Sequence, residues 1–256
     1  MRSFMAFFKK ELLEGAREGK LLLLGILFLV FGIMNPAIAK LTPYLMDLLS
    51  EELAGSGMIV TEVTVDALTS WTQFFKNIPM ALIAFVLLYG GIFTKEYRTG
   101  TLILVLTQGL ARIKVLLAKA ASLFLIWTAG YWLCFFVTYA YNAYFWDNRI
   151  ATGLFPSAIN WWLFGIFVLS LMILWSVLAT SDGTVLVGTG ACILCCYLLS
   201  LLPKLSFYVP TALMNSAKLL VGMEGASDYR TALLICIGLC IVAVIVSIPI
   251  FNKKQI

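Results

Sequence analysis

Residues that could do chemistry are few in this sequence, and most of them have apolar neighbours. Histidine, the commonest general base and a frequent metal ligand, is absent. The six cysteines all fall inside apolar runs, and Cys192 and Cys195 have a C-x-x-C spacing. A free cysteine in such a run behaves as a small buried hydrophobe, and no polar loop accompanies the pair to complete a metal site. We therefore expect no metal site, no disulfide framework and no catalytic residue.

Carboxylates could serve a membrane-embedded enzyme that acts on lipids or prenyl chains, which is one alternative function. Such a site needs clustered ionisable side chains that face a cavity. The carboxylates expected on the cytoplasmic side are scattered and contain no D-D-x-x-D arrangement: Glu11, Glu14, Glu18, Glu96 and Asp182. A passive channel is a second alternative, but the sequence has no charged or carbonyl filter motif. It also has no phosphate-binding G-x-x-x-x-G-K-[ST] loop, so we expect ATP hydrolysis to require another chain.

The most elaborate polar segment is residues 94–112, TKEYRTGTLILVLTQGLAR, expected between the second and third spans. It opens with charged residues, Gly100 supplies a backbone break, and Thr101 to Leu106 is apolar enough to pack as a short helix. One interpretation is a basic anchor that follows the positive-inside rule. The other is a docking element that pushes on the spans when a partner moves. The residues alone leave both interpretations open.

Composition identifies the elements that must position this segment. Hydrophobic residues make up 62% of the chain and charged residues 12%, against about 45–50% and about 25% in soluble domains. The apolar runs are long enough to cross a hydrocarbon core about 30 Å thick. The sequence therefore predicts an all-α membrane protein with six transmembrane helices, at about 21–39, 78–93, 113–141, 161–180, 184–202 and 231–251.

The first twenty residues predict a cytoplasmic interfacial helix. Phe4, Phe8 and Leu12 recur at helical spacing, although Phe7 breaks the pattern. Charged residues occupy the remaining directions, as is typical of a helix that lies along a membrane surface.

Two outer segments complete the expected architecture. The longest polar interval, residues 41–77, is predicted to be the first outer loop. Residues 204–230 are predicted to form an outer excursion, because the apolar stretch 212–221 within it is too short to span. We expect this stretch to dip into the outer leaflet and to return at Gly222 or Gly225.

Basic residues decide the orientation. If both termini are cytoplasmic, the inner segments carry 12 of the 18 Lys and Arg residues, namely Arg2, Lys9, Lys10, Arg17, Lys20, Lys95, Arg98, Arg112, Lys114, Lys119, Lys253 and Lys254. The outer segments then carry the other 6, namely Lys40, Lys76, Arg149, Lys204, Lys218 and Arg230. The sequence therefore predicts a multi-pass protein of the plasma membrane with both termini in the cytoplasm.

The docking segment carries a resemblance to a known family. Its residues resemble the E-x-x-x-G-T…S-R-x-K…K signature of type-2 ABC-transporter permeases at Glu96–Thr101, Arg112, Lys114 and Lys119. The order of amphipathic helix, spans and outer excursion is also similar to that family. The chain departs from the pattern at Gly109, where a proline is usual, and at Ala111, where a serine is usual.

This resemblance implies a bacterial transport subunit that works with two copies of a separate ATP-binding cassette subunit. That partner would bring ATP and magnesium, and this chain would hold no cofactor and bind no nucleic acid. A second permease copy, as a homodimer, would complete the path through the membrane lipid. The resemblance places the contact with the ATPase at Phe8, Glu11, Glu14, Glu96, Arg98, Thr99, Gly100, Thr101, Arg112 and Lys114.

The spans suggest the chemistry of the cargo. Most lack ionisable residues, which favours an amphipathic or hydrophobic cargo over an ion, and the exception, Lys119, is expected to extend to the interface. The resemblance favours peptides, with a lipid-linked glycan or a drug as the alternative. Trp132, Phe135, Phe136 and Tyr139 are expected to share one stripe. This stripe faces either lipid or the seam between two copies, where it would contact the cargo.

The predicted orientation can be tested by labelling single cysteines in intact cells. A membrane-impermeant maleimide should react with a Gly225→Cys variant from outside and should not reach a Gly183→Cys variant, because of the asymmetry in basic residues. Permeabilised cells provide the control in which both sites react. Outside labelling at position 183 would reverse the predicted orientation.

Overall fold

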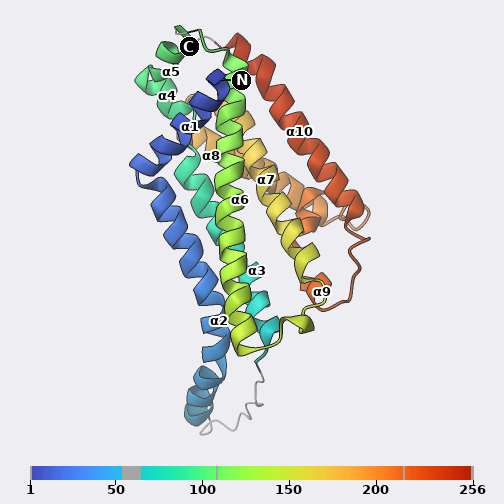
Figure 1. The fold of residues 1–256 in the computed structure, drawn as a ribbon. Helices are drawn as coiled ribbons and strands as arrows, with labels where there is room; N and C mark the ends of the chain where they lie inside the picture. The colour runs from blue at the N-terminus through green and yellow to red at the C-terminus, as the bar shows by residue number, and fades with distance from the viewer. Residues whose placement is uncertain (1, 54–64, 108, 216, 255–256) are drawn as a thin grey trace.

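Helices account for the regular structure of the described chain (Figure 1). The computed structural model describes residues 2–53, 65–107, 109–215 and 217–254, and this part contains no strand. The elements in order are α1 (Arg2–Arg17), α2 (Lys20–Leu53), α3 (Ala67–Tyr89), α4 (Thr94–Thr99), α5 (Thr101–Thr107), α6 (Arg112–Phe145), η2 (Asn148–Ile150), α7 (Leu154–Leu178), α8 (Asp182–Ser200), η3 (Pro210–Met214), α9 (Ala217–Leu220) and α10 (Arg230–Lys253). The prediction of an all-α protein is confirmed.

Among the described residues, six helical stretches are long and apolar enough to cross a membrane, as predicted. They are Lys20–Met46, Ala67–Thr99, Arg112–Phe145, Leu154–Leu178, Asp182–Ser200 and Arg230–Lys253. Both ends of the chain lie at the same end of the bundle as α1, α4 and α5 (Figure 1). We call this the terminal end.

The expected first outer loop, residues 41–77, is instead helical at both of its ends. Helix α2 continues to Leu53, and α3 begins at Ala67. Asp66 caps α3 by accepting a hydrogen bond from the Thr69 backbone N–H at 2.9 Å. Polar residues end a membrane crossing but do not end a helix, because its backbone hydrogen bonds continue outside the hydrocarbon. Residues 54–64 lie outside the described part.

Aromatic side chains fill the core between α3, α6 and α7. Trp71 of α3 packs on Phe135 of α6 with ring centroids 5.0 Å apart. Phe85 packs edge-on against Trp127 at 5.7 Å. Tyr131 is fully buried, and its hydroxyl donates a hydrogen bond to the Ala158 carbonyl at 2.7 Å, which satisfies a polar group inside an apolar core. These contacts make α3, α6 and α7 one packed unit.

The outer excursion contains two short elements, η3, which ends at Met214, and α9, which spans Ala217–Leu220. The chain does turn back at Gly222, whose φ of 73° lies in the left-handed region that favours glycine. Leu213 and Leu219 are buried against the bundle, so the excursion packs onto the spans.

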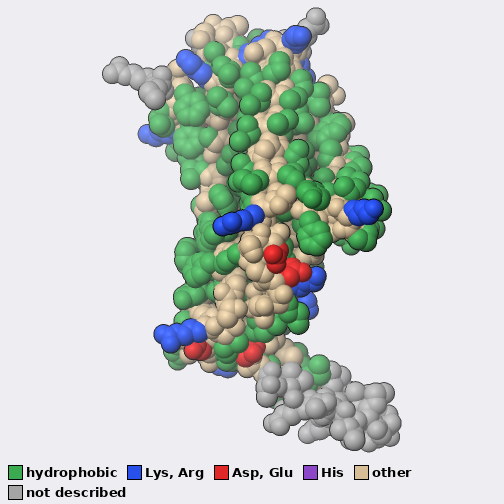
Figure 2. Space-filling view, turned by 90° about the vertical axis from the view of Figure 1, so that its right-hand side faces the viewer, with side chains coloured by type: hydrophobic (Ala, Val, Ile, Leu, Met, Phe, Trp, Pro, Cys, Tyr) green, Lys and Arg blue, Asp and Glu red, His purple; other side chains and the backbone are tan. Residues whose placement is uncertain are grey.

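The surface of the bundle is strongly apolar. Figure 2 shows hydrophobic side chains over the upper part of one face, below Lys and Arg side chains at its top edge. Large exposed residues on α8 and α10, such as Val187, Leu194 and Leu234, belong to this apolar surface. Such a surface is expected where lipid or a second protein replaces water.

Close helix packing depends on a few small residues, and Gly165 of α7 gives a test. A Cβ at this position would overlap the indole ring of Trp127. A Gly165→Val variant should therefore lower the free energy of unfolding by about 1–3 kcal/mol through overpacking, measured by thermal unfolding in detergent. Gly25→Val is the matched control, since nothing lies within 4 Å of its added Cβ. Equal stability of the two variants would contradict this packing.

Candidate coupling site

The docking segment folds into two short helices separated by Gly100. Helix α4 ends there because Gly100 has a φ of 68°, which supplies the predicted backbone break. In α5 the side chain of Leu102 is buried, whereas Ile103 and Leu104 are exposed, Leu104 to 62%. The segment therefore presents an apolar edge at the terminal end of the bundle.

A buried lysine joins this segment to α1 and α6. Lys119 of α6 is only 2% exposed, so it does not extend to the interface as predicted. Its ammonium group lies 2.8 Å from a Glu11 carboxylate oxygen and 3.1 Å from Glu96. The rings of Phe7 and Phe93 flank it at 5.8 and 5.5 Å. A buried charge requires such partners, and here the two carboxylates come from two separate elements, α1 and α4.

The inward face of α1 also differs from the prediction. Phe7, which broke the expected apolar stripe, is the buried phenylalanine, whereas Phe4 and Phe8 are half-buried and stack on each other at 6.3 Å. Because Glu11 turns inward to meet Lys119, the packed face of α1 mixes apolar and acidic residues. Helical periodicity of apolar residues alone could not identify this face.

Lys10 extends the ion network at the surface of α1. Its ammonium group lies 2.7 Å from Glu14 and 3.1 Å from both Glu11 and Glu96. The carboxylate oxygens of Glu11, Glu14 and Glu96 lie within 4.8 Å of one another, a grouping that could suit a metal. Lys10 and Lys119 already pair with these oxygens, so the donor set fits ammonium groups rather than a metal ion.

Glu18 closes the network at the end of α1. Hydrogen bonds from Lys20 and then Lys95 lower the pKa of Glu18 from 4.5 to about 2. Because the folded pKa is depressed, this contribution to stability is present above about pH 4.5 and is lost as the pH falls toward 2. Glu18 is therefore ionised at neutral pH.

The residues of α4 contact several different elements. Its first five residues are Thr94, Lys95, Glu96, Tyr97 and Arg98. Glu96 joins the buried network, and Lys95 pairs with Glu18. The Tyr97 ring lies 4.2 Å from the Lys254 ammonium group. Thr94 and Arg98 both donate to Asp182 at the start of α8. A displacement of α4 would therefore act on several spans.

Two basic residues cap helix ends beside α4. Arg112 donates to the carbonyl oxygens of Phe251 and Lys254 at the end of α10, at 2.9 and 2.6 Å. Lys254 donates to the carbonyls of Val177 and Ala179 at the end of α7, both at 2.7 Å. Cations at the C-terminal ends of helices satisfy free carbonyls and oppose the helix dipole.

The residues predicted to contact an ATPase fall into three groups. Arg98, Thr99 and Thr101 are exposed near Gly100. The hydroxyl groups of Thr99 and Thr101 lie 3.0 Å apart. Glu96 is only 5% exposed, because its carboxylate neutralises Lys119 inside the chain, so it offers a partner little surface. The others bind within the chain and reach the surface only in part: Phe8, Glu11, Glu14, Arg112 and Lys114, the last donating to Ser3 at 3.3 Å.

One residue of the predicted aromatic stripe, Phe135, lies in the core rather than on the surface. Phe135 is fully buried between Trp71 and other core rings, whereas its neighbour Phe136 is exposed. Consecutive residues of an α-helix point about 100° apart, so these two cannot share a face. Trp132 is half-buried and Tyr139 is exposed. Phe135, in contrast, packs in the core and faces neither lipid nor a second copy.

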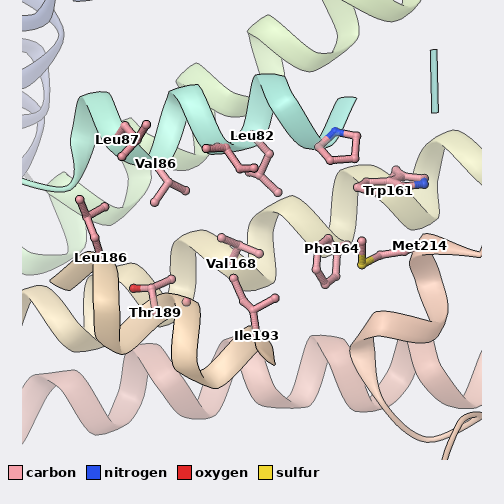
Figure 3. Close-up of a pocket in the computed structure, with 13 residues that line it drawn as sticks. Leu82, Val86, Leu87, Trp161, Phe164, Val168, Leu186, Thr189, Ile193 and Met214 are labelled. Carbon is pink, nitrogen blue, oxygen red and sulfur yellow. The ribbon is translucent and has the colours of Figure 1, made fainter. Parts of the chain in front are cut away.

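An apolar groove lies elsewhere, between α3 and α8, with α7 as its floor (Figure 3). Its cavity has a volume of about 330 Å³. The lining residues are Pro79, Leu82, Ile83, Val86, Leu87, Trp161, Phe164, Val168, Leu186, Thr189, Gly190, Ile193 and Met214. None of them carries a charge, so the groove suits an apolar chain rather than an ion.

The described chain thus has six helices long and apolar enough to span a membrane, with α4 and α5 at the terminal end beside α1. Residues 5–256 match the ABC-2 family transporter protein family, and the chain belongs to this family. It is thus a membrane transport subunit, and the family implies an ATP-binding partner subunit. No curated protein matches the chain.

Sequence reasoning missed several residues of the site. Asp182 lies in a three-residue link where basic residues are expected, and this mismatch was the available signal. Tyr97 and Lys254 gave no such signal, because their partners lie far away in the sequence. Lys10 was counted only as a basic residue of the inner side.

The buried network predicts a large effect of one substitution. A Lys119→Met variant leaves Glu11 and Glu96 without their buried partner, so the free energy of unfolding should fall by about 3 kcal/mol or more. Thermal unfolding in detergent measures this loss, and adding Glu96→Gln should recover part of it. Lys9→Met, at an exposed position, is the matched control. A Lys119→Met variant as stable as the control would contradict the network.

Proposed function

We propose that the chain is the permease subunit of an ATP-driven exporter for an amphipathic or hydrophobic cargo, with peptides as the favoured class. The observation that carries this proposal is the uncharged groove between α3 and α8, which ends beside a docking segment. Transfer of an apolar cargo from water into the groove lowers the free energy of the system. Trp161 and Phe164 line the groove and offer aromatic surface for this contact.

The ATP-binding partner would supply ATP and magnesium, with two copies serving two permease chains. The exposed part of the docking segment, Arg98 through Leu104, is the surface proposed for its contact. The second permease would be a copy of this chain, and the apolar surface of α8 supports such a pairing. This arrangement places both termini in the cytoplasm of a bacterial cell and the cargo exit on the outer side.

A lipid-linked glycan or drug remains the alternative cargo, since an acyl chain would fit the same groove. The carboxylates Glu11, Glu14, Glu18 and Glu96 line one small cavity rather than lying scattered as expected, but lysines pair with them, which disfavours a lipid-modifying enzyme. Glu11 and Glu96 are neutralised by lysines, and no carboxylate lines the groove. Purification of the chain with its bound partners distinguishes a transport subunit from an enzyme, because an exporter subunit should co-purify with an ATPase chain.

The groove assignment predicts a specific transport defect. A Gly190→Trp variant would fill the groove from α8, and nothing lies within 4 Å of a Cβ at this position. Resistance of cells to several unrelated amphipathic peptides should fall together, whereas binding of the ATPase should be retained. Gly238→Trp, on α10 outside the groove, is the matched control with equally open space. Full resistance in the Gly190→Trp cells would remove the groove from the path.

A further inference from the structure

The groove narrows toward the terminal end, where α3 and α8 meet. At that end a Cβ at Gly90 would lie 3.0 Å from the Leu186 side chain, and one at Gly91 would lie 3.1 Å from an Asp182 carboxylate oxygen. Farther along, both helices line the cavity, α3 through Leu82 and α8 through Ile193 (Figure 3). The contact at Asp182 therefore lies at the end where the two helices are close, and this end would be the fixed point if α8 tilted.

Helix α8 packs on α7 and η3 through a narrow face. Its described buried residues are Val185, Gly188 and Thr189, which lie on one side of the helix. Two hydrogen bonds also hold it, one from Trp175 to the Cys192 sulfur at 3.4 Å and one from Thr211 to the Cys196 carbonyl at 3.2 Å. A helix with so narrow a packed face can tilt about a fixed end.

Asp182 fixes that end to the docking segment. One carboxylate oxygen accepts a hydrogen bond from the buried Thr94 hydroxyl, and the other lies 2.9 Å from the Arg98 guanidinium. The side chains of Arg98 and Asp182 are 63% and 42% exposed, so their ion pair is of the weak, adjustable kind. In contrast, Glu96 ties α4 to α6 through a buried lysine, which resists separation.

We propose that Asp182 is a positioning residue that holds α8 to α4 and thereby sets the width of the groove. We call Asp182, Thr94 and Arg98 the latch. This inference rests on the proposed function. An ATPase that binds Arg98 would compete with Asp182, release the latch and let α8 swing away from α3, while α4 stays tied to α1 and α6.

The first test uses the full chain alone, in detergent. All six cysteines are replaced by alanine, with folding checked by thermal unfolding, and a pair, Ile83→Cys with Gly190→Cys, is placed across the groove. A short bismaleimide reports how often the two walls are close. Asp182→Asn should lower the cross-linking yield about threefold, since it removes the charge of an exposed ion pair, and Asp182→Glu should retain most of it.

Ser181→Ala is the matched control, because Ser181 caps α8 through the Thr184 backbone N–H without joining the latch. Its yield should equal that of the parent pair. An Asp182→Asn yield equal to the parent would overturn the inference. An equal loss in Ser181→Ala would also overturn it, because the effect would then report only the start of α8.

The second test uses the complex with the co-purified ATPase. A nonhydrolysable ATP analogue should change the cross-linking yield of the parent pair, and Asp182→Asn should abolish this change while ATP hydrolysis continues. A parent complex whose yield ignores the analogue would overturn the inference and leave the proposed function intact. Failure of any ATPase to bind would instead overturn the proposed function, whereas the first test on the chain alone would stand.

Discussion

The ammonium group of Lys119 must be neutralised where it lies, and this requirement fixes α1 and α4 against α6. A lone charge transferred from water to a protein interior costs several kcal/mol. Glu11 and Glu96 offset that cost from two elements that would otherwise be free to slide on an apolar surface. The same demand turns Glu11 inward, rotates α1 so that Phe7 is buried, and withdraws Glu96 from the surface. One buried charge thus determines the arrangement of the terminal end.

Away from that end, the bundle depends on shape rather than charge. Rings of Trp71, Phe85, Trp127 and Phe135 interlock between α3, α6 and α7, and Gly165 allows Trp127 to approach α7. Helix α8 contributes none of these rings and has a narrower packed face. The groove lies between α8 and the unit formed by α3, α6 and α7.

The sequence predicted what depends on local composition and missed what depends on distant partners. Six spans, the break at Gly100 and the turn at Gly222 follow from apolar length and glycine geometry. The pairing of Lys119 with Glu11 joins residues 108 positions apart, so no local pattern contains it. Phe135 was expected on the aromatic stripe because composition reveals that a helix is apolar but not which of its sides faces protein. A docking role for residues 94–112 was expected only through the resemblance to a family, since these residues alone were compatible with a simple anchor.

The two kinds of ion pair on α4 give the docking segment a direction of action. The buried pair with Lys119 is strong when intact and costly to break, because each separated charge would remain in a medium of low polarity. The exposed pair with Asp182 is close to neutral in free energy, because water solvates either partner once it is released. When force is applied to α4, the ion pair that needs the least free energy to separate therefore breaks first. That contact is the one on α8, so the arrangement of charges, rather than the flexibility of any loop, selects which span responds.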